Sequence, residues 1–230
     1  MKTVINLVNF LIKRREVLAH MKHLETQEIV DGIYVIGEKS ANFYVLKNGD
    51  EYLAIDAGSS KNTAENELKK LHIEPEKITS VLLTHTDFDH IAALSLFKNA
   101  AIYLSKEEVQ MIDGSTARMF GFGNRLKYGY KTLEDGEEIY FENRKVRPVL
   151  TLGHTAGSTS FIVDDIYLFV GDNLSLRNGQ VNLFDSLFNM DDSIQQESLK
   201  QLAKIQGIKY IFTAHYGFSD NFCEAFEKFR

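Results

Sequence analysis

The chain has 230 residues, 44% of them hydrophobic and 25% charged, which suffices to bury the core of one α/β domain and leaves no room for a second. Its 26 basic and 32 acidic residues give a net charge of −6, which disfavours a broad nucleic-acid-binding surface because phosphate recognition needs clustered Lys and Arg. A small-molecule substrate is therefore expected, and the lone Cys223, which cannot form an internal disulfide, indicates a cytoplasmic location.

The first segment, residues 1–24, repeats apolar residues at helical spacing, among them Leu7, Leu11 and Leu18. This spacing predicts an amphipathic helical extension ahead of a domain at residues 25–230. The apolar run is too short to span a bilayer and is followed by charged residues instead of a small-residue cleavage site, so neither a membrane segment nor an export signal is expected. The extension is expected to pack on the domain or on a partner subunit, as in a homodimer.

Short strand-like runs alternate with helical ones along the rest of the chain. Strands are predicted at residues 32–36, 43–47, 52–56, 80–84, 101–104, 138–141, 145–150, 159–163, 166–170 and 210–213. Helices are predicted at residues 61–72, 90–98, 106–112, 193–205 and 220–229. Strands outnumber helices and fall into two sets, which is typical of a mixed α/β domain.

Four potential metal ligands stand within six residues, directly after the predicted strand at 80–84. They are His85, Asp87, Asp89 and His90. Ionised aspartates this close repel one another, and a divalent cation removes that cost. The alternative is a polar loop after a buried strand that holds no ion.

Three further candidate ligands each follow an apolar run, namely His154, Asp172 and His215. Side chains delivered from strand ends can converge along one edge of a sheet, although they are distant in the sequence. Imidazole and carboxylate together suit zinc, iron or manganese. Seven converging ligands are too many for one ion.

These motifs resemble the signature of the metallo-β-lactamase fold superfamily, which reads His-x-His-x-Asp-His, then a Gly-His-Thr-x-Gly-Ser turn, an Asp after a strand and a late His. The chain departs from it at Asp87, where the signature has its second histidine, so the motif is His-x-Asp-x-Asp-His. A carboxylate at that position is similar to the flavodiiron branch, which has Glu there. Residues 42–46 and 55–58 also resemble the first sheet of the family, so the resemblance covers residues 28–217.

The resemblance implies a four-layer αβ/βα sandwich of two mixed β-sheets flanked by helices, with a metal site at one rim. It implies two divalent ions, with zinc expected first and iron or manganese after it. In the family the first ion is held by the residues that match His85, Asp87 and His154. The second is held by those that match Asp89, His90 and His215, and Asp172 bridges the two.

The implied function is a dinuclear metal-dependent hydrolase that acts on a small ester, thioester or lactone. A metal-bridging hydroxide attacks the carbonyl, and Asp89 orients it and accepts its proton. Because Asp87 replaces a neutral histidine, the two ions, three aspartates and one hydroxide sum to zero charge, which favours a neutral acyl substrate over a phosphodiester.

Two other functions stay open. The carboxylate of Asp87 allows a di-iron oxidoreductase of flavodiiron type, although such proteins need a flavin-binding partner domain. A phosphodiesterase or nuclease of the same fold would need a basic rim, for which the candidates are Arg118, Arg125, Lys127 and Lys131.

Several residues outside these motifs have a structural and a functional interpretation. Asp56 either supports a ligand histidine or caps the turn at residues 58–60. His20, His23 and His72 are expected to be ordinary surface or core histidines. The aromatic, glycine-containing segment at 119–130 is expected to cover the pocket as a lid, the alternative being that it packs on the edge of the domain.

Overall fold

The computed structural model describes residues 21–117 and 124–230. Most of the predicted N-terminal helix therefore lies outside the described residues, but its last four residues, 21–24, are described and are not helical. There the helix prediction is wrong, because the backbone of Lys22 pairs instead with the segment after the last long strand. Lys22 forms a bridge to Tyr216, and its N–H donates to the carbonyl of His215 at 2.6 Å.

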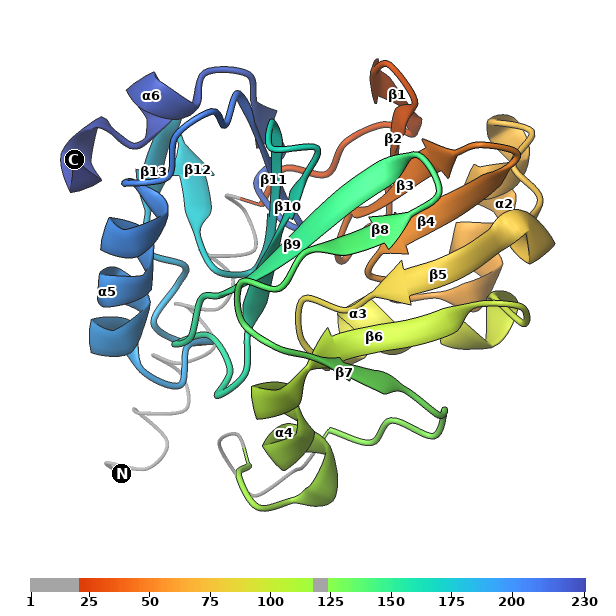
Figure 1. Ribbon diagram of the computed structural model, residues 1–230, viewed down its shortest axis with the longest axis horizontal. Helices are drawn as coiled ribbons and strands as arrows, with labels where there is room; N and C mark the ends of the chain where they lie inside the picture. The colour runs from red at the N-terminus through yellow and green to blue at the C-terminus, as the bar shows by residue number, and fades with distance from the viewer. Residues whose placement is uncertain (1–20, 118–123) are drawn as a thin grey trace, which may run out of the picture.

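The described chain folds into two mixed sheets that pack face to face between outer helices (Figure 1). The seven-stranded sheet has the order β1 (Gln27–Val30), β2 (Ile33–Ile36), β3 (Phe43–Asn48), β4 (Glu51–Ile55), β5 (Ile78–Leu82), β6 (Ala101–Ser105) and β7 (Lys131–Leu133). The six-stranded sheet has the order β15 (Phe218–Ser219), β14 (Tyr210–Thr213), β11 (Tyr167–Gly171), β10 (Thr159–Val163), β9 (Arg144–Leu150) and β8 (Ile139–Phe141). β12 (Ser175–Arg177) and β13 (Gln180–Asn182) form a separate hairpin.

The helices are short and lie on the outer faces of the two sheets. Beside the first sheet are α2 (Lys61–Lys70) and α3 (Phe88–Ile91), and beside the second are α5 (Asp192–Leu202) and α6 (Phe222–Ala225) (Figure 1). α4 (Val109–Asp113) follows β6. Single 3₁₀ turns lie at Pro75–Lys77, Leu94–Leu96, Lys106–Glu108 and Glu227–Phe229. In the described part of the chain, no helix is both long and apolar enough to cross a membrane.

The layers arise because successive side chains along the central strands pack on opposite sides of each sheet. In β3, Val45 packs into the cluster beneath α2, whereas Tyr44 and Leu46 face the second sheet. In β11, Phe169 faces the first sheet, and its neighbour Leu168 packs towards α5. Since successive side chains of a strand point to opposite faces, both faces of these strands are apolar and need a covering layer. The four-layer sandwich of two mixed sheets is therefore confirmed.

All ten predicted strands are present, with ends shifted by at most two residues, whereas several predicted helices break early. The helix predicted at 90–98 ends at Ile91, because the N–H of Ala93, which would donate to the carbonyl of Asp89 in a continued helix, donates instead to the carbonyl of Gly58 at 3.3 Å. The short strands β1, β7, β12, β13 and β15 were not predicted, and most of them pair at the sheet edges or outside the sheets.

Candidate metal centre

The structure brings all seven predicted ligands together where the two sheets meet at one rim. His85, Asp87, Asp89 and His90 follow β5 of the first sheet, and the last three begin or lie within α3. The others come from the second sheet: His154 follows β9, Asp172 directly follows β11, and His215 lies two residues after β14. The strands end at a common edge, so that residues far apart in sequence are delivered to one place.

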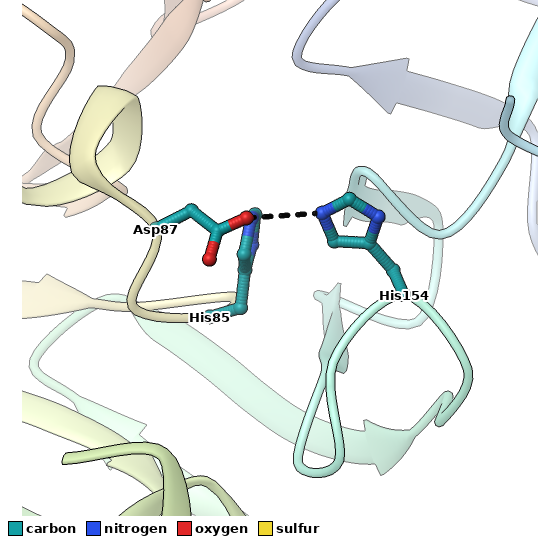
Figure 2. Close-up of side chains that lie close together, drawn as sticks. All are labelled: His85, Asp87 and His154. Carbon is teal, nitrogen blue, oxygen red and sulfur yellow. Dashed lines mark ion pairs between the residues drawn. The ribbon is translucent and has the colours of Figure 1, made fainter. Parts of the chain in front are cut away.

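The first group comprises His85, Asp87 and His154. Oδ2 of Asp87 lies 3.5 Å from Nε2 of His85 and 3.4 Å from Nε2 of His154. Figure 2 shows the three side chains converging, with His85 and Asp87 on one loop and His154 on another, and the dashed line marks the ion pair between Asp87 and His154. Ligands about 2.0–2.1 Å from a tetrahedral zinc ion are about 3.3 Å from one another, so this spacing fits an ion shared by the three side chains.

The second group comprises Asp89, His90 and His215. Nε2 of His215 is 3.5 Å from Oδ2 of Asp89, and Nε2 of His90 is 4.0 Å from Oδ1 of the same carboxylate. Asp172 lies between the two groups. Its Oδ2 is 3.4 Å from Nε2 of His154 and 3.2 Å from Nε2 of His215, which places one carboxylate within reach of both sets.

The buried polar atoms at this centre show that its donor set suits metal ions. Nε2 of His85, Nε2 of His90 and Oδ1 of Asp172 are buried without a hydrogen-bond partner among the described residues. Buried polar atoms are normally paired, so nitrogen and oxygen atoms of this kind that converge on one point fit a bound cation. Four imidazoles and three carboxylates are an N/O donor set suited to zinc, iron or manganese.

At three of the four histidines the other ring nitrogen is held by a neighbouring polar group, which leaves Nε2 directed at the centre, whereas Nδ1 of His215 is buried without such a partner among the described residues. Nδ1 of His90 lies 2.9 Å from Oδ2 of Asp56, Nδ1 of His85 lies 3.0 Å from Oγ1 of Thr84, and Nδ1 of His154 lies 3.2 Å from Oδ1 of Asn189. Such partners fix the tautomer and orientation of ligating histidines. Of the two interpretations of Asp56, the structure therefore shows support of a histidine, and Oδ1 of Asp56 also accepts from the backbone N–H of Thr84.

The charges at the centre strongly perturb one another. Burial lowers the pKa of His90, but the carboxylates of Asp172, Asp56 and Asp89 outweigh burial and hold that pKa well above its ordinary value. Burial raises the pKa of Asp172, but His215 and His90 outweigh it and hold that pKa well below its ordinary value. The carboxylates thus stabilise positive charge at this place, either as protons on the rings or as metal ions.

Glu108 is a functional residue that sequence reasoning missed. Its side chain is fully buried and accepts three hydrogen bonds, from the backbone N–H of Thr86 at 2.8 Å, from Oγ1 of Thr86 at 2.7 Å and from Oγ1 of Thr155 at 2.7 Å. Burial raises its pKa. Thr86 lies between His85 and Asp87, and Thr155 follows His154, so Glu108 joins the two ligand loops. In the sequence it belongs to an acidic pair with Glu107, which resembles a solvated helix start.

A cavity of ≈ 540 Å³ opens over the centre. Its floor contains Asp87, Asp89, His154, Asp172 and His215, and its walls contain Phe88, Phe184, Phe188, Met21, His23, Lys39 and Ser40. His23 was expected to be a surface or core histidine; it is exposed, and it also lines the cavity. It reaches the cavity because the extended segment around Lys22 pairs with the segment after β14.

The lid predicted at 119–130 is described from residue 124 onwards, and residues 119–123 lie outside the described part. None of residues 124–130 lines the cavity. The aromatic wall comes instead from Phe184 and Phe188, in the segment between β13 and α5. The lid remains a prediction for residues 119–123.

The sequence of this chain is similar to those of known metal-dependent hydrolases. A family model described as the metallo-beta-lactamase superfamily matches residues 36–215. A probable metallo-hydrolase of Methanocaldococcus jannaschii is 33% identical over 150 residues, which cover 65% of this chain and 63% of that protein. A hydroxyacylglutathione hydrolase of a Shewanella species is 25% identical over 185 residues, 80% of this chain and 61% of that protein. The aligned part of the chain thus spans less than two thirds of the length of either relative.

Solved structures agree on the fold. A B3 metallo-beta-lactamase described as having an active-site glutamic acid superposes with a TM-score of 0.69 at 14% identity, covering 95% of this chain and 91% of that one. At this identity the likeness concerns the fold alone.

Proposed function

The chain belongs to the metallo-beta-lactamase superfamily and is a metal-dependent hydrolase, and from this we propose that it hydrolyses a small ester, thioester or lactone at a centre of two divalent ions, zinc first. The observation that carries the proposal is the division of the ligands into two three-residue groups with Asp172 within reach of both. One group would hold each ion, and Asp172 would bridge them. A carboxylate shared in this way would hold two ions close together.

When bound, the ions supply Lewis-acid activation of water and stabilise negative charge that develops on a carbonyl oxygen. Asp89 is the residue proposed to orient the attacking water and accept its proton. Its side chain is 33% exposed and lines the cavity, whereas that of Asp172 is only 6% exposed. A carboxylate acting as a general base must reach the water while it also faces the substrate, and the position of Asp89 supports that role.

The cavity walls support an acyl substrate. Phe88 is 74% exposed and, with Phe184 and Phe188, gives the cavity an apolar side beside the ligands. The described lining includes one lysine, Lys39, and no arginine, whereas a phosphodiester substrate needs clustered cations. The Shewanella relative is named for the hydrolysis of hydroxyacylglutathione, a thioester, which supports the same class. We also propose that the protein acts on this small molecule in the cytoplasm, without a nucleic-acid or membrane partner.

A di-iron oxidoreductase is the second candidate, and Asp87 favours it. A carboxylate in place of an imidazole hardens the first group of ligands, and hard oxygen ligands shift preference from zinc towards iron or manganese. The identity of the native metal distinguishes the two candidates.

The test is elemental analysis of protein purified without added metal, combined with turnover of a lactone, a thioester, a β-lactam and a phosphodiester. We expect about two zinc ions per chain and turnover of the lactone or the thioester. The matched control is Asp89→Asn, which should lose turnover while its fold is retained. Iron at both positions without hydrolysis of any acyl substrate would replace this proposal with the oxidoreductase.

A further inference from the structure

Asn124 contacts the unusual ligand of the first group. Its Nδ2 donates to Oδ1 of Asp87 at 3.0 Å and to Oγ1 of Thr86 at 3.0 Å. The other oxygen of Asp87, Oδ2, faces Nε2 of His85 and of His154 at 3.5 and 3.4 Å. One carboxylate thus has an oxygen on Asn124 and an oxygen on the proposed metal position.

The orientation of the Asn124 amide follows from its partners. The single proton of the Thr86 hydroxyl is donated to Glu108, so Oγ1 can only accept from Asn124. The carboxylate of Asp87 also only accepts. Both neighbours therefore require the amide nitrogen, and its two protons are both used. The backbone of Asn124 is held as well, because its N–H donates to the carbonyl of Met111 in α4 at 3.0 Å.

A carboxylate at position 87 needs such a contact more than a histidine does. The terminal torsion of an aspartate is broad and its two oxygens are equivalent, so the side chain alone does not define which oxygen faces an ion.

We propose that Asn124 is a positioning residue that presents Asp87 through Oδ2 and thereby sets the metal affinity of the first group. This inference depends on the proposed function in one respect, namely that Asp87 is a metal ligand. A hydrogen bond to a ligating carboxylate restricts it to one geometry before the ion binds. Removing such a partner typically costs 10–100-fold in metal affinity. The dependence is specific to the aspartate, since an imidazole would present a single nitrogen.

The experiment is a double-mutant cycle between Asn124→Leu and Asp87→His. Zinc binding to metal-free protein is measured by competition with a chromophoric chelator, which needs no substrate. We expect Asn124→Leu to weaken one of two binding steps by about 10–100-fold and leave the other step unchanged. In the Asp87→His background the same substitution should leave both steps unchanged. Equal effects in both backgrounds, or none in either, overturn the proposal.

Three further variants keep the test interpretable. Asn124→Ser, which shortens the side chain without the apolar bulk of leucine, replaces Asn124→Leu if thermal unfolding shows that the latter is not cooperatively folded. Tyr128→Ala is the control for truncation in the same segment, and it should leave both binding steps unchanged because Tyr128 is exposed. If wild-type protein binds zinc but Asp87→Ala binds it equally well, the ligand assignment in the proposed function is wrong. If Asp87→Ala loses zinc and Asn124→Leu does not, only the role of Asn124 is wrong.

Discussion

Replacing Glu108 with alanine should destabilise the fold and loosen the metal centre together. The carboxylate accepts from Thr86 and Thr155, and each of those threonines is a neighbour of a proposed ligand. Its loss leaves the backbone N–H of Thr86 buried without its partner, which costs about 1–3 kcal/mol. The Thr86 hydroxyl still accepts from Asn124 but loses the acceptor of its proton, and the Thr155 hydroxyl keeps its contact with Ser158, so the lost hydroxyl bonds add about 1 kcal/mol.

An opposing contribution comes from burial of the carboxylate itself. Burial raises the pKa of Glu108, so the charged form is disfavoured in the folded protein. Removal of the carboxylate offsets part of this loss, and we expect a net destabilisation of about 1–3 kcal/mol. Because the folded protein holds the proton of Glu108 more tightly than the unfolded chain does, proton binding at Glu108 stabilises the wild-type fold. This contribution is fully present below the unfolded pKa of about 4.3 and is lost as the pH rises through the higher folded pKa.

The assay is urea unfolding followed by circular dichroism in the presence of EDTA, so that metal release does not contribute. Glu134→Ala removes an exposed carboxylate that pairs with Lys106, and it should change the unfolding free energy little. Glu108→Gln should be less destabilised than Glu108→Ala. As the pH falls from 7 towards 5, the unfolding free energy of the wild type should rise relative to that of Glu108→Gln. A change below about 1 kcal/mol for Glu108→Ala would show that the two loops are held by other contacts.

Three further predictions concern the centre and its cavity. Asp172→Ala should lose at least one metal ion per chain by elemental analysis, since Asp172 reaches both groups, and an unaltered metal content would remove the two-ion interpretation. Asp87→His adds one positive charge beside the bound water, so the acid limb of the pH–rate profile should move to lower pH, and an unchanged limb with both ions retained contradicts the charge argument. Phe188→Ala should change the ranking of acyl substrates through KM, because Phe188 lines the cavity. Tyr128→Ala should leave the ranking unchanged, because Tyr128 does not line the cavity. Equal effects of the two variants would support the lid at 119–130 as the determinant of specificity.

The proposed ligands could be found in the sequence because each follows a strand that the sequence marks clearly. The run before Asp172 supplies Leu168 and Val170 to one apolar layer and Phe169 to the next, so it reads as a continuous apolar strand. A metal-capable polar residue directly after such a run is therefore identified as lying at the end of the strand. The metal-capable side chains could therefore be identified without knowledge of how the strands are ordered.

Glu108, Asn124 and His23 could not be found in this way, because their positions depend on contacts between distant segments. Asn124 is 37 residues from Asp87 and Glu108 is 47 from Thr155, and nothing in the local sequence of either indicates the partner. The same cause shortened the predicted helices. The N–H of Ala93 donates to the carbonyl of Gly58, a contact between two segments that local helical spacing does not reveal.

The substitution at position 87 links these two classes of residue. A histidine ligand is oriented by a partner on its second nitrogen, as Asp56 orients His90 and Asn189 faces His154. An aspartate ligand is oriented by a donor on its second oxygen, and Asn124 provides one. The chemical type of the partner therefore follows from the type of ligand: acceptors for the rings, a donor for the carboxylate. A chain that exchanges histidine for aspartate at this motif position needs a donor at the place that Asn124 occupies, and Asp87→His should make that donor dispensable.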